Sequence, residues 1–156
     1  MSSTRALANH SLYLAKIQLS AWQGQLEAQQ LPVALLGQAF LPAVRAHLLD
    51  TYGWLLLTLI DAPESSGPLP RFVAELQSVA PGKATPGSLN ELQRLEQHGW
   101  LAALQQSPQL APSASNKSRG NLAATEVPAT GFDEAASWCD SMETAIETLC
   151  DSLDEC

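Results

Sequence analysis

The sequence predicts an all-α protein, an antiparallel helical bundle of four to five helices with a disordered linker before an acidic C-terminal helix. Three observations support this fold. Apolar residues recur every three or four positions in the segments 4–30, 31–61 and 133–155. Segments rich in Pro, Gly and Ser separate the helical patterns. The 156 residues are enough for one domain that folds without metals or disulfides.

We therefore expect a single domain, residues 1–156, with its parts in a fixed order along the chain. The bundle core spans 4–106, a flexible linker spans 107–131, and an acidic amphipathic helix at 132–156 docks on the core. The linker is assigned from its Ser, Ala, Asn, Pro, Thr and Gly residues, which leave little apolar surface to bury. The sequence leaves open whether the acidic helix docks on its own chain or on another.

The first two helices are expected to form an antiparallel hairpin. Residues 4–30 carry one apolar stripe along a long helix, and only Leu31 and Pro32 follow before the next helical pattern begins. Short helix–helix connections join antiparallel neighbours. The second helix, 31–61, is so apolar that it should occupy the centre of the bundle. Pro42 either kinks this helix or marks the start of the main helix after a shorter one, and we favour the kink.

A membrane span is not expected in this second helix. Spanning needs about 20 predominantly apolar residues. Arg45, His47 and Asp50 interrupt the segment where a span would be deepest.

Two shorter helices are expected between 68 and 106. Pro68 and Pro70 would open one that ends near Val79. Ser88 and Glu91 match a capping box that would start the next. Gly99 would end or bend that helix before Trp100.

The net negative charge of the chain comes entirely from its C-terminal end. Residues 1–131 carry eight acids and eight bases, whereas residues 132–156 carry eight acids and no Lys or Arg. On a helix the large apolar residues of this last segment share one face and the acids share the opposite face. Because nucleic acids and anionic membranes attract positive charge, this composition argues against both as direct partners.

The acidic face is the candidate binding site that the sequence offers. It can be a solvated face that keeps the protein soluble, or a docking surface for a basic protein. The candidate partner-binding residues are Asp140, Glu143, Glu147, Asp151 and Asp154.

No catalytic, cofactor-binding or metal-binding residues are predicted. None of the three histidines has a Glu three residues before it, which a di-metal helical bundle would need. Cys139, Cys150 and Cys156 are spaced unlike zinc ligands, and the first two should be small buried side chains. The odd cysteine count and the lack of a secretory signal at the N-terminus predict a cytoplasmic protein with reduced thiols.

Three runs of residues resemble a known family. Residues 43–52, 92–96 and 99–101 are similar to a small family of all-helical gammaproteobacterial proteins that are known only as a domain of unknown function. The resemblance covers the helical parts and implies a compact bundle, without an activity. The Ala43-to-Leu49 run also resembles HEPN-type helical nucleases. Those place a catalytic Arg and His at a longer spacing, whereas Arg45 and His47 are two residues apart and point nearly oppositely on a helix.

The functional expectation is a non-enzymatic cytoplasmic bundle that acts through protein–protein contacts, with a protein partner or with itself. The alternative is a degenerate HEPN-like protein that processes nucleic acid. A pocket that combined Arg45, His47 and Asp50 with another polar group would favour this alternative.

Overall fold

The computed structural model describes residues 3–62, 67–76, 86–106 and 131–154. These residues are all-α: they form five α-helices and one short 3-10 helix, and no strand. The elements are α1 (Ser3–Ala28), α2 (Val33–Leu59), η1 (Val73–Glu75), α3 (Pro86–His98), α4 (Trp100–Gln105) and α6 (Phe132–Asp154). None of the helices in the described ranges has the length and apolar character to cross a membrane.

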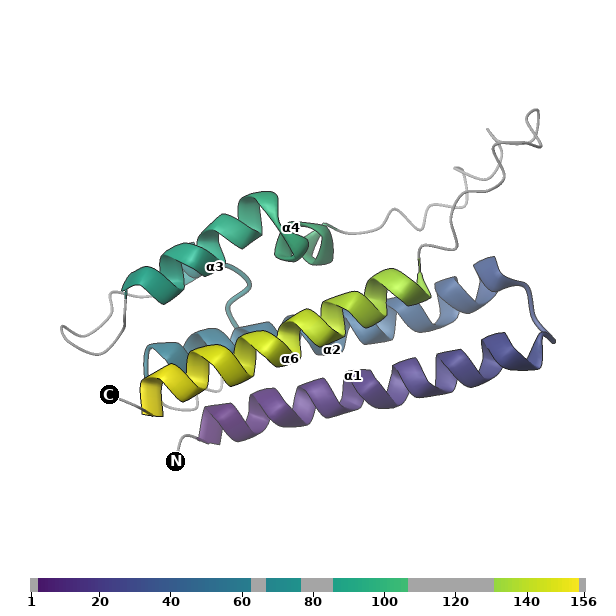
Figure 1. The fold of residues 1–156 in the computed structure, drawn as a ribbon, viewed down its shortest axis with the longest axis horizontal. Helices are drawn as coiled ribbons and strands as arrows, with labels where there is room; N and C mark the ends of the chain where they lie inside the picture. The colour runs from purple at the N-terminus through teal and green to yellow at the C-terminus, as the bar shows by residue number, and fades with distance from the viewer. Residues whose placement is uncertain (1–2, 63–66, 77–85, 107–130, 155–156) are drawn as a thin grey trace.

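The three long helices α1, α2 and α6 lie side by side along the length of the molecule (Figure 1). At one end of the α1–α2 pair, Thr58 donates a hydrogen bond to the Thr4 hydroxyl at 2.9 Å. At the other end Trp22 stacks on Phe40, with ring centroids 6.0 Å apart. The two helices are therefore antiparallel, which confirms the predicted hairpin. Trp22 also meets Phe132 edge-on at 5.5 Å, so α6 starts beside the C-terminal end of α1.

The core lies between these three helices, and α2 is its centre. Leu48, Tyr52, Leu55 and Leu56 of α2 are fully buried. Of the α2 residues from 51 to 59, only positions 54 and 57 are partly exposed. The helix is thus covered on nearly all sides, as its composition predicts. From α6, Met142 is fully buried against this core.

Pro42 lies inside α2, which runs without a break from residue 33 to residue 59. The alternative that a new helix starts at Pro42 is therefore wrong. Proline removes one backbone hydrogen bond of the helix interior. Pro42 is exposed, so the carbonyl that loses its partner is on the solvent side of the helix.

The prediction of a helix that starts at Pro68 is wrong for the part of that segment that the structure describes. Residues 67–76 contain only the 3-10 turn at 73–75, and 77–79 lie outside the described residues. Carboxylates take the amides that a helix would use: the Arg71 N–H donates to Glu75 at 2.6 Å and the Val73 N–H donates to Glu96 at 2.8 Å. Phe72 of this segment is 41% exposed.

The segment 67–76 instead packs closely on α2 at Gly53. A Cβ at this position would lie 2.8 Å from the Leu69 Cβ and 2.9 Å from the Pro70 carbonyl oxygen. Only glycine therefore fits without a shift of the chain. Gly53 therefore permits a non-helical segment to approach α2 closely.

The boundaries of α3 and α4 correct one expectation and confirm another. Helix α3 begins at Pro86, two residues before Ser88, so the predicted capping box does not start it. It ends at His98, and α4 begins at Trp100, so the Gly99 break is confirmed. Gly99 is extended, with φ −114° and ψ −160°. The predicted linker lies outside the described residues, except for Gly131.

Candidate functional site

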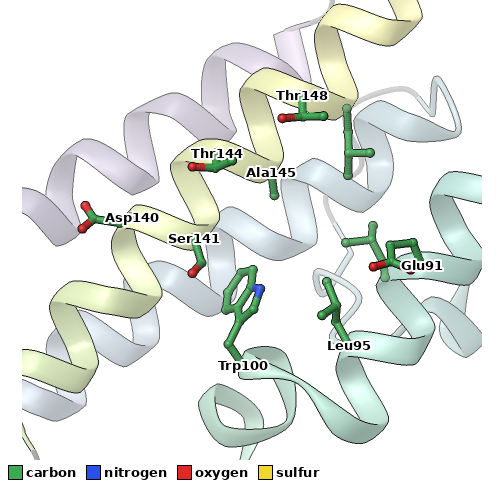
Figure 2. A pocket seen from close by; sticks show the side chains of 10 residues that line it. Glu91, Leu95, Trp100, Asp140, Ser141, Thr144, Ala145 and Thr148 are labelled. Carbon is green, nitrogen blue, oxygen red and sulfur yellow. The ribbon is translucent and has the colours of Figure 1, made fainter.

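A groove of about 460 Å³ lies between α6 on one side and α3 and α4 on the other (Figure 2). We call it the α3–α6 groove. Its lining residues are Glu91, Leu92, Leu95, Trp100, Asp140, Ser141, Thr144, Ala145, Thr148 and Leu149.

The wall formed by α3 and α4 is apolar. Leu92 and Leu95 are three residues apart on α3 and so share one face of that helix. Leu92 is buried, whereas Leu95 is half-buried. The break at Gly99 redirects the chain so that the half-buried Trp100, the first residue of α4, faces α6 across the groove (Figure 2).

The wall formed by α6 consists mainly of short side chains. Ser141, Thr144, Ala145, Thr148 and Leu149 follow the helix at spacings of three and four, so they form one continuous stripe. Serine, alanine and threonine do not reach far from the helix axis. The space between α6 and α3 is therefore left unfilled, and Thr144 and Thr148 are exposed at its edge.

Both charged residues of the lining are carboxylates, and they differ in their partners. Glu91 accepts two hydrogen bonds from the Arg94 guanidinium, at 3.0 and 2.6 Å. This pairing lowers the pKa of Glu91. Asp140 is exposed and forms no ion pair with another described residue. The rim of the groove thus has one carboxylate that is paired, Glu91, and one that is exposed, Asp140, whose charge acts on Lys16 of α1 without forming an ion pair.

Arg45 holds α4 against the central helix. Its Nε and Nη2 atoms donate to the carbonyl oxygens of Leu104 and Gln105, each at 2.8 Å. The last carbonyls of a helix lack partners within the helix, and a cation stabilises them. Burial of the guanidinium lowers the pKa of Arg45, and the nearby positive charge of Arg71 adds to this effect.

Tyr52 and Glu96 hold α3 in a similar way. The Tyr52 hydroxyl donates to the Glu96 carboxylate at 2.5 Å, and the same carboxylate oxygen accepts the Val73 N–H at 2.8 Å. Tyr52 is fully buried. Burial raises the pKa of Tyr52, and the hydrogen bond to Glu96 raises it further. These bonds position the α3 and α4 wall of the groove relative to α2.

The structure does not bring Arg45, His47 and Asp50 together in the groove, and none of the three lines it. Arg45 binds the end of α4. Asp50 forms an ion pair with Arg71 at 3.4 Å. His47 is half-buried, and its carbonyl accepts the Thr51 hydroxyl at 2.7 Å.

The predicted acidic face is divided between two environments. Glu143 forms an ion pair with Lys16 of α1, which raises the pKa of Lys16. Asp151 pairs with Arg5 of α1 at 3.2 Å. Asp140 lies on the rim of the groove, and Glu147 is exposed. The side chain of Asp154 lies outside the described part of the chain.

Cys139 and Cys150 are buried thiols, which confirms the prediction of small buried side chains. Burial raises the pKa of Cys139 to about 11; Lys16 opposes this shift, and Asp140 and Glu143 add to it. Cys156 lies outside the described residues. Within those residues, no three His, Cys, Asp or Glu side chains are grouped so that they could hold a metal ion.

The groove itself is absent from the sequence-based predictions, which divide the last helix into an apolar and an acidic face. The missed signal is the stripe of Ser141, Thr144, Ala145 and Thr148 between these two faces. Short side chains at helical spacing mark a face that comes close to a neighbour or leaves a groove beside it. Which neighbour faces the stripe depends on the path of the chain through 67–76, and this path is not encoded in local periodicity.

No family model, curated protein or solved structure matches this chain at a significant level.

Proposed function

We propose that this chain is a non-enzymatic helical-bundle protein that acts through protein–protein contacts, and that the α3–α6 groove is its contact surface. One observation carries the proposal. Trp100, Leu95 and Leu149 are only half-buried and line an open groove. Apolar side chains that line a concave groove with a few polar groups are typical of a binding site, and Trp is among the residues that contribute most to binding energy in interfaces.

The shape of the groove favours a protein segment over a small molecule. The α6 wall extends from Ser141 to Leu149, which is about 12 Å along a helix, or roughly two turns. Glu91, Asp140, Thr144 and Thr148 are all exposed along the edges. Small-molecule sites enclose most of their ligand, whereas an elongated groove with open edges suits a helix that lies in it.

The hydrogen bonds of Arg45, Tyr52 and Glu96 support this use of the groove. They fix the α3 and α4 wall to α2. A wall held in place before binding lowers the ordering cost that association has to overcome. We also propose a cytoplasmic location, because an odd number of cysteines cannot all pair within one chain.

A photo-crosslinking amino acid placed at Thr144 tests the proposal in living cells. We expect a discrete adduct with one protein, which is lost when Leu95→Arg is introduced into the groove. The same amino acid at Ser20, on the exposed side of α1, serves as the control and should give no such adduct. If Thr144 and Ser20 give the same pattern, or if Leu95→Arg leaves the adduct unchanged while circular dichroism shows a folded protein, the groove is not the contact surface.

A further inference from the structure

We propose that the occupant of the α3–α6 groove is a basic amphipathic helix of a partner protein; this inference rests on the proposed function and names the chemistry of the partner. The helix would place its apolar side chains against Leu95, Trp100 and Leu149 and its Lys and Arg side chains along the α6 rim. The length of the α6 wall corresponds to roughly two turns of such a helix.

The charge of the groove favours a basic partner. The charged residues of its lining, Glu91 and Asp140, are both acidic. Helix α6, which forms one entire wall, has seven acids between residues 132 and 154 and no Lys or Arg. A positively charged partner would therefore be attracted to this wall and oriented along it.

The acids of α6 differ in whether they form ion pairs with the rest of the chain. On the α1 side of α6, the carboxylates of Glu143 and Asp151 are paired with Lys16 and Arg5. Among the described residues, Asp140, Glu134 and Glu147 form no ion pair. Glu134 lies seven residues before Ser141, so it continues the same face of α6 two turns beyond the groove. Glu147 lies between Glu143 and Asp151 at i,i+4 spacing and so belongs to the α1 side. Asp140, which is on the rim of the groove and also acts on Lys16, and Glu134 are the acids that remain for a partner.

A second copy of this chain fits the groove less well. Helix α1 supplies two bases, Arg5 and Lys16, and both are engaged with α6 of the same chain. On α3, Arg94 is engaged with Glu91. The described helices therefore have no basic face to offer to another molecule's groove. Self-association becomes one outcome of the test and not the proposal.

Peptide binding to the full-length protein tests the inference. The probe is a fluorescent amphipathic peptide of roughly four helical turns, with Leu on one face and Lys on its flanks. It is compared with the same peptide carrying Glu for Lys, and with the Lys peptide carrying Ser for Leu. We expect the Lys–Leu peptide to bind at least about 10-fold more tightly than either, and to weaken as the salt concentration rises, because screening reduces the attraction between exposed charges.

Three variants locate the binding. Asp140→Asn should weaken the Lys–Leu peptide by roughly 2- to 5-fold, as expected for one exposed rim charge. Glu27→Gln makes the same change in charge at an exposed position of α1 and should leave binding unchanged. Thr148→Trp fills the groove from an exposed position without altering the core, and it should abolish binding while circular dichroism shows unchanged helicity.

The outcomes separate this inference from the proposed function. If the Glu peptide binds as well as the Lys peptide, or if Asp140→Asn and Glu27→Gln behave alike, the basic character of the partner is wrong. An adduct at Thr144 in cells that proves to be a second copy of this chain would also overturn the inference but retain a protein-binding groove. Loss of both peptide binding and the Thr144 adduct would overturn both proposals.

Discussion

Gly53 shows how a single residue permits close packing. The segment 67–76 lies against α2 at this glycine, and its Val73 N–H donates a hydrogen bond to Glu96 of α3. Gly53→Ala should lower the free energy of unfolding by about 1–3 kcal/mol, because the new Cβ would overpack Leu69 and the Pro70 carbonyl. Urea denaturation followed by circular dichroism measures the change.

Gly24 offers the matched control. It lies in α1, and a Cβ there would meet nothing within 4 Å. Gly24→Ala should raise the free energy of unfolding by about 0.5–1 kcal/mol, since alanine favours a helix interior over glycine. If the two substitutions had the same sign, the close approach at Gly53 would not be the cause of its effect.

The buried thiol of Cys139 should make the free energy of unfolding depend on pH in the alkaline range. Its pKa is about 11 in the folded protein, above the ordinary value of 9.0. Between these two pH values the unfolded thiol loses its proton while the folded thiol keeps it. The unfolded state then binds fewer protons, so stability falls as pH rises through this window.

A Cys139→Ala variant isolates this contribution from that of Tyr52, whose pKa is also raised. The variant should lose less stability than the wild type between pH 9 and pH 11, as measured by urea midpoints across the window set by Cys139. Equal pH dependence in the two proteins would contradict the buried, neutral thiol.

Arg45 marks a limit of prediction from sequence at the scale of one residue. A lone Arg on an apolar helix can bind a ligand, pair with an acid or cap another helix, and periodicity does not distinguish these roles. Here its two donors bind the carbonyls of residues 104 and 105, which are nearly sixty positions away in the chain. This contact is visible only once α4 has its place in the fold.

At the scale of elements, the long helices were predictable because each has a continuous apolar stripe. The ends of α1, α2 and α6 fall within about two residues of their predicted positions, which is the usual uncertainty of helix ends. The segment from Pro68 was misjudged because Glu75 and Glu96 bind its amides. The predicted start of α3 at Ser88 is wrong because the helix already begins at Pro86, a residue type that suits the first turn of a helix. The acidic face is predicted from α6 alone, without its neighbours. In the structure two of its acids, Glu143 and Asp151, face α1 and pair with Lys16 and Arg5.

The docking of α6 separates the contribution of apolar burial from that of ion pairs. Met142 of α6 is fully buried against the core. Met142→Ala should cost about 2–5 kcal/mol of unfolding free energy through lost transfer energy and a cavity. Lys16→Ala removes the exposed ion pair with Glu143 and should cost at most about 1 kcal/mol.

Salt provides the internal check on this comparison. Added salt should reduce the effect of Lys16→Ala, because both side chains are solvent-exposed. It should leave the effect of Met142→Ala unchanged. Chemical denaturation by urea at two salt concentrations measures both effects, and a larger loss for Lys16→Ala than for Met142→Ala would mean that charge holds α6 in place.

At the scale of the whole molecule, burial is distributed unevenly. Most buried apolar residues belong to α1, α2 and α6. Within the described ranges, α3 and α4 contribute only Leu92, Leu101 and Leu104 to the fully buried set. Four further apolar residues of α3 and α4 pack against the core but are only partly buried: Leu89, Leu95, Trp100 and Ala103. Hydrogen bonds of Arg45, Tyr52 and Gln105 add to the attachment of these two helices. The groove therefore has one wall in the densely packed part of the molecule and one wall that is held by fewer apolar contacts.

This asymmetry predicts a difference in hydrogen exchange, because regions with few buried apolar contacts open at a lower free energy. Amides of α3 and α4 should exchange faster than those of α2 and α6. Arg45→Ala should speed exchange in α4 further, since the carbonyls of Leu104 and Gln105 lose their donors, while exchange in α1 stays unchanged. Binding of the Lys–Leu peptide should slow exchange in α3 and α4 more than in α2, because the ligand would add apolar contacts between these two helices and α6. Equal exchange rates in all helices would contradict this prediction. They would mean that both walls of the groove open together in a single cooperative step.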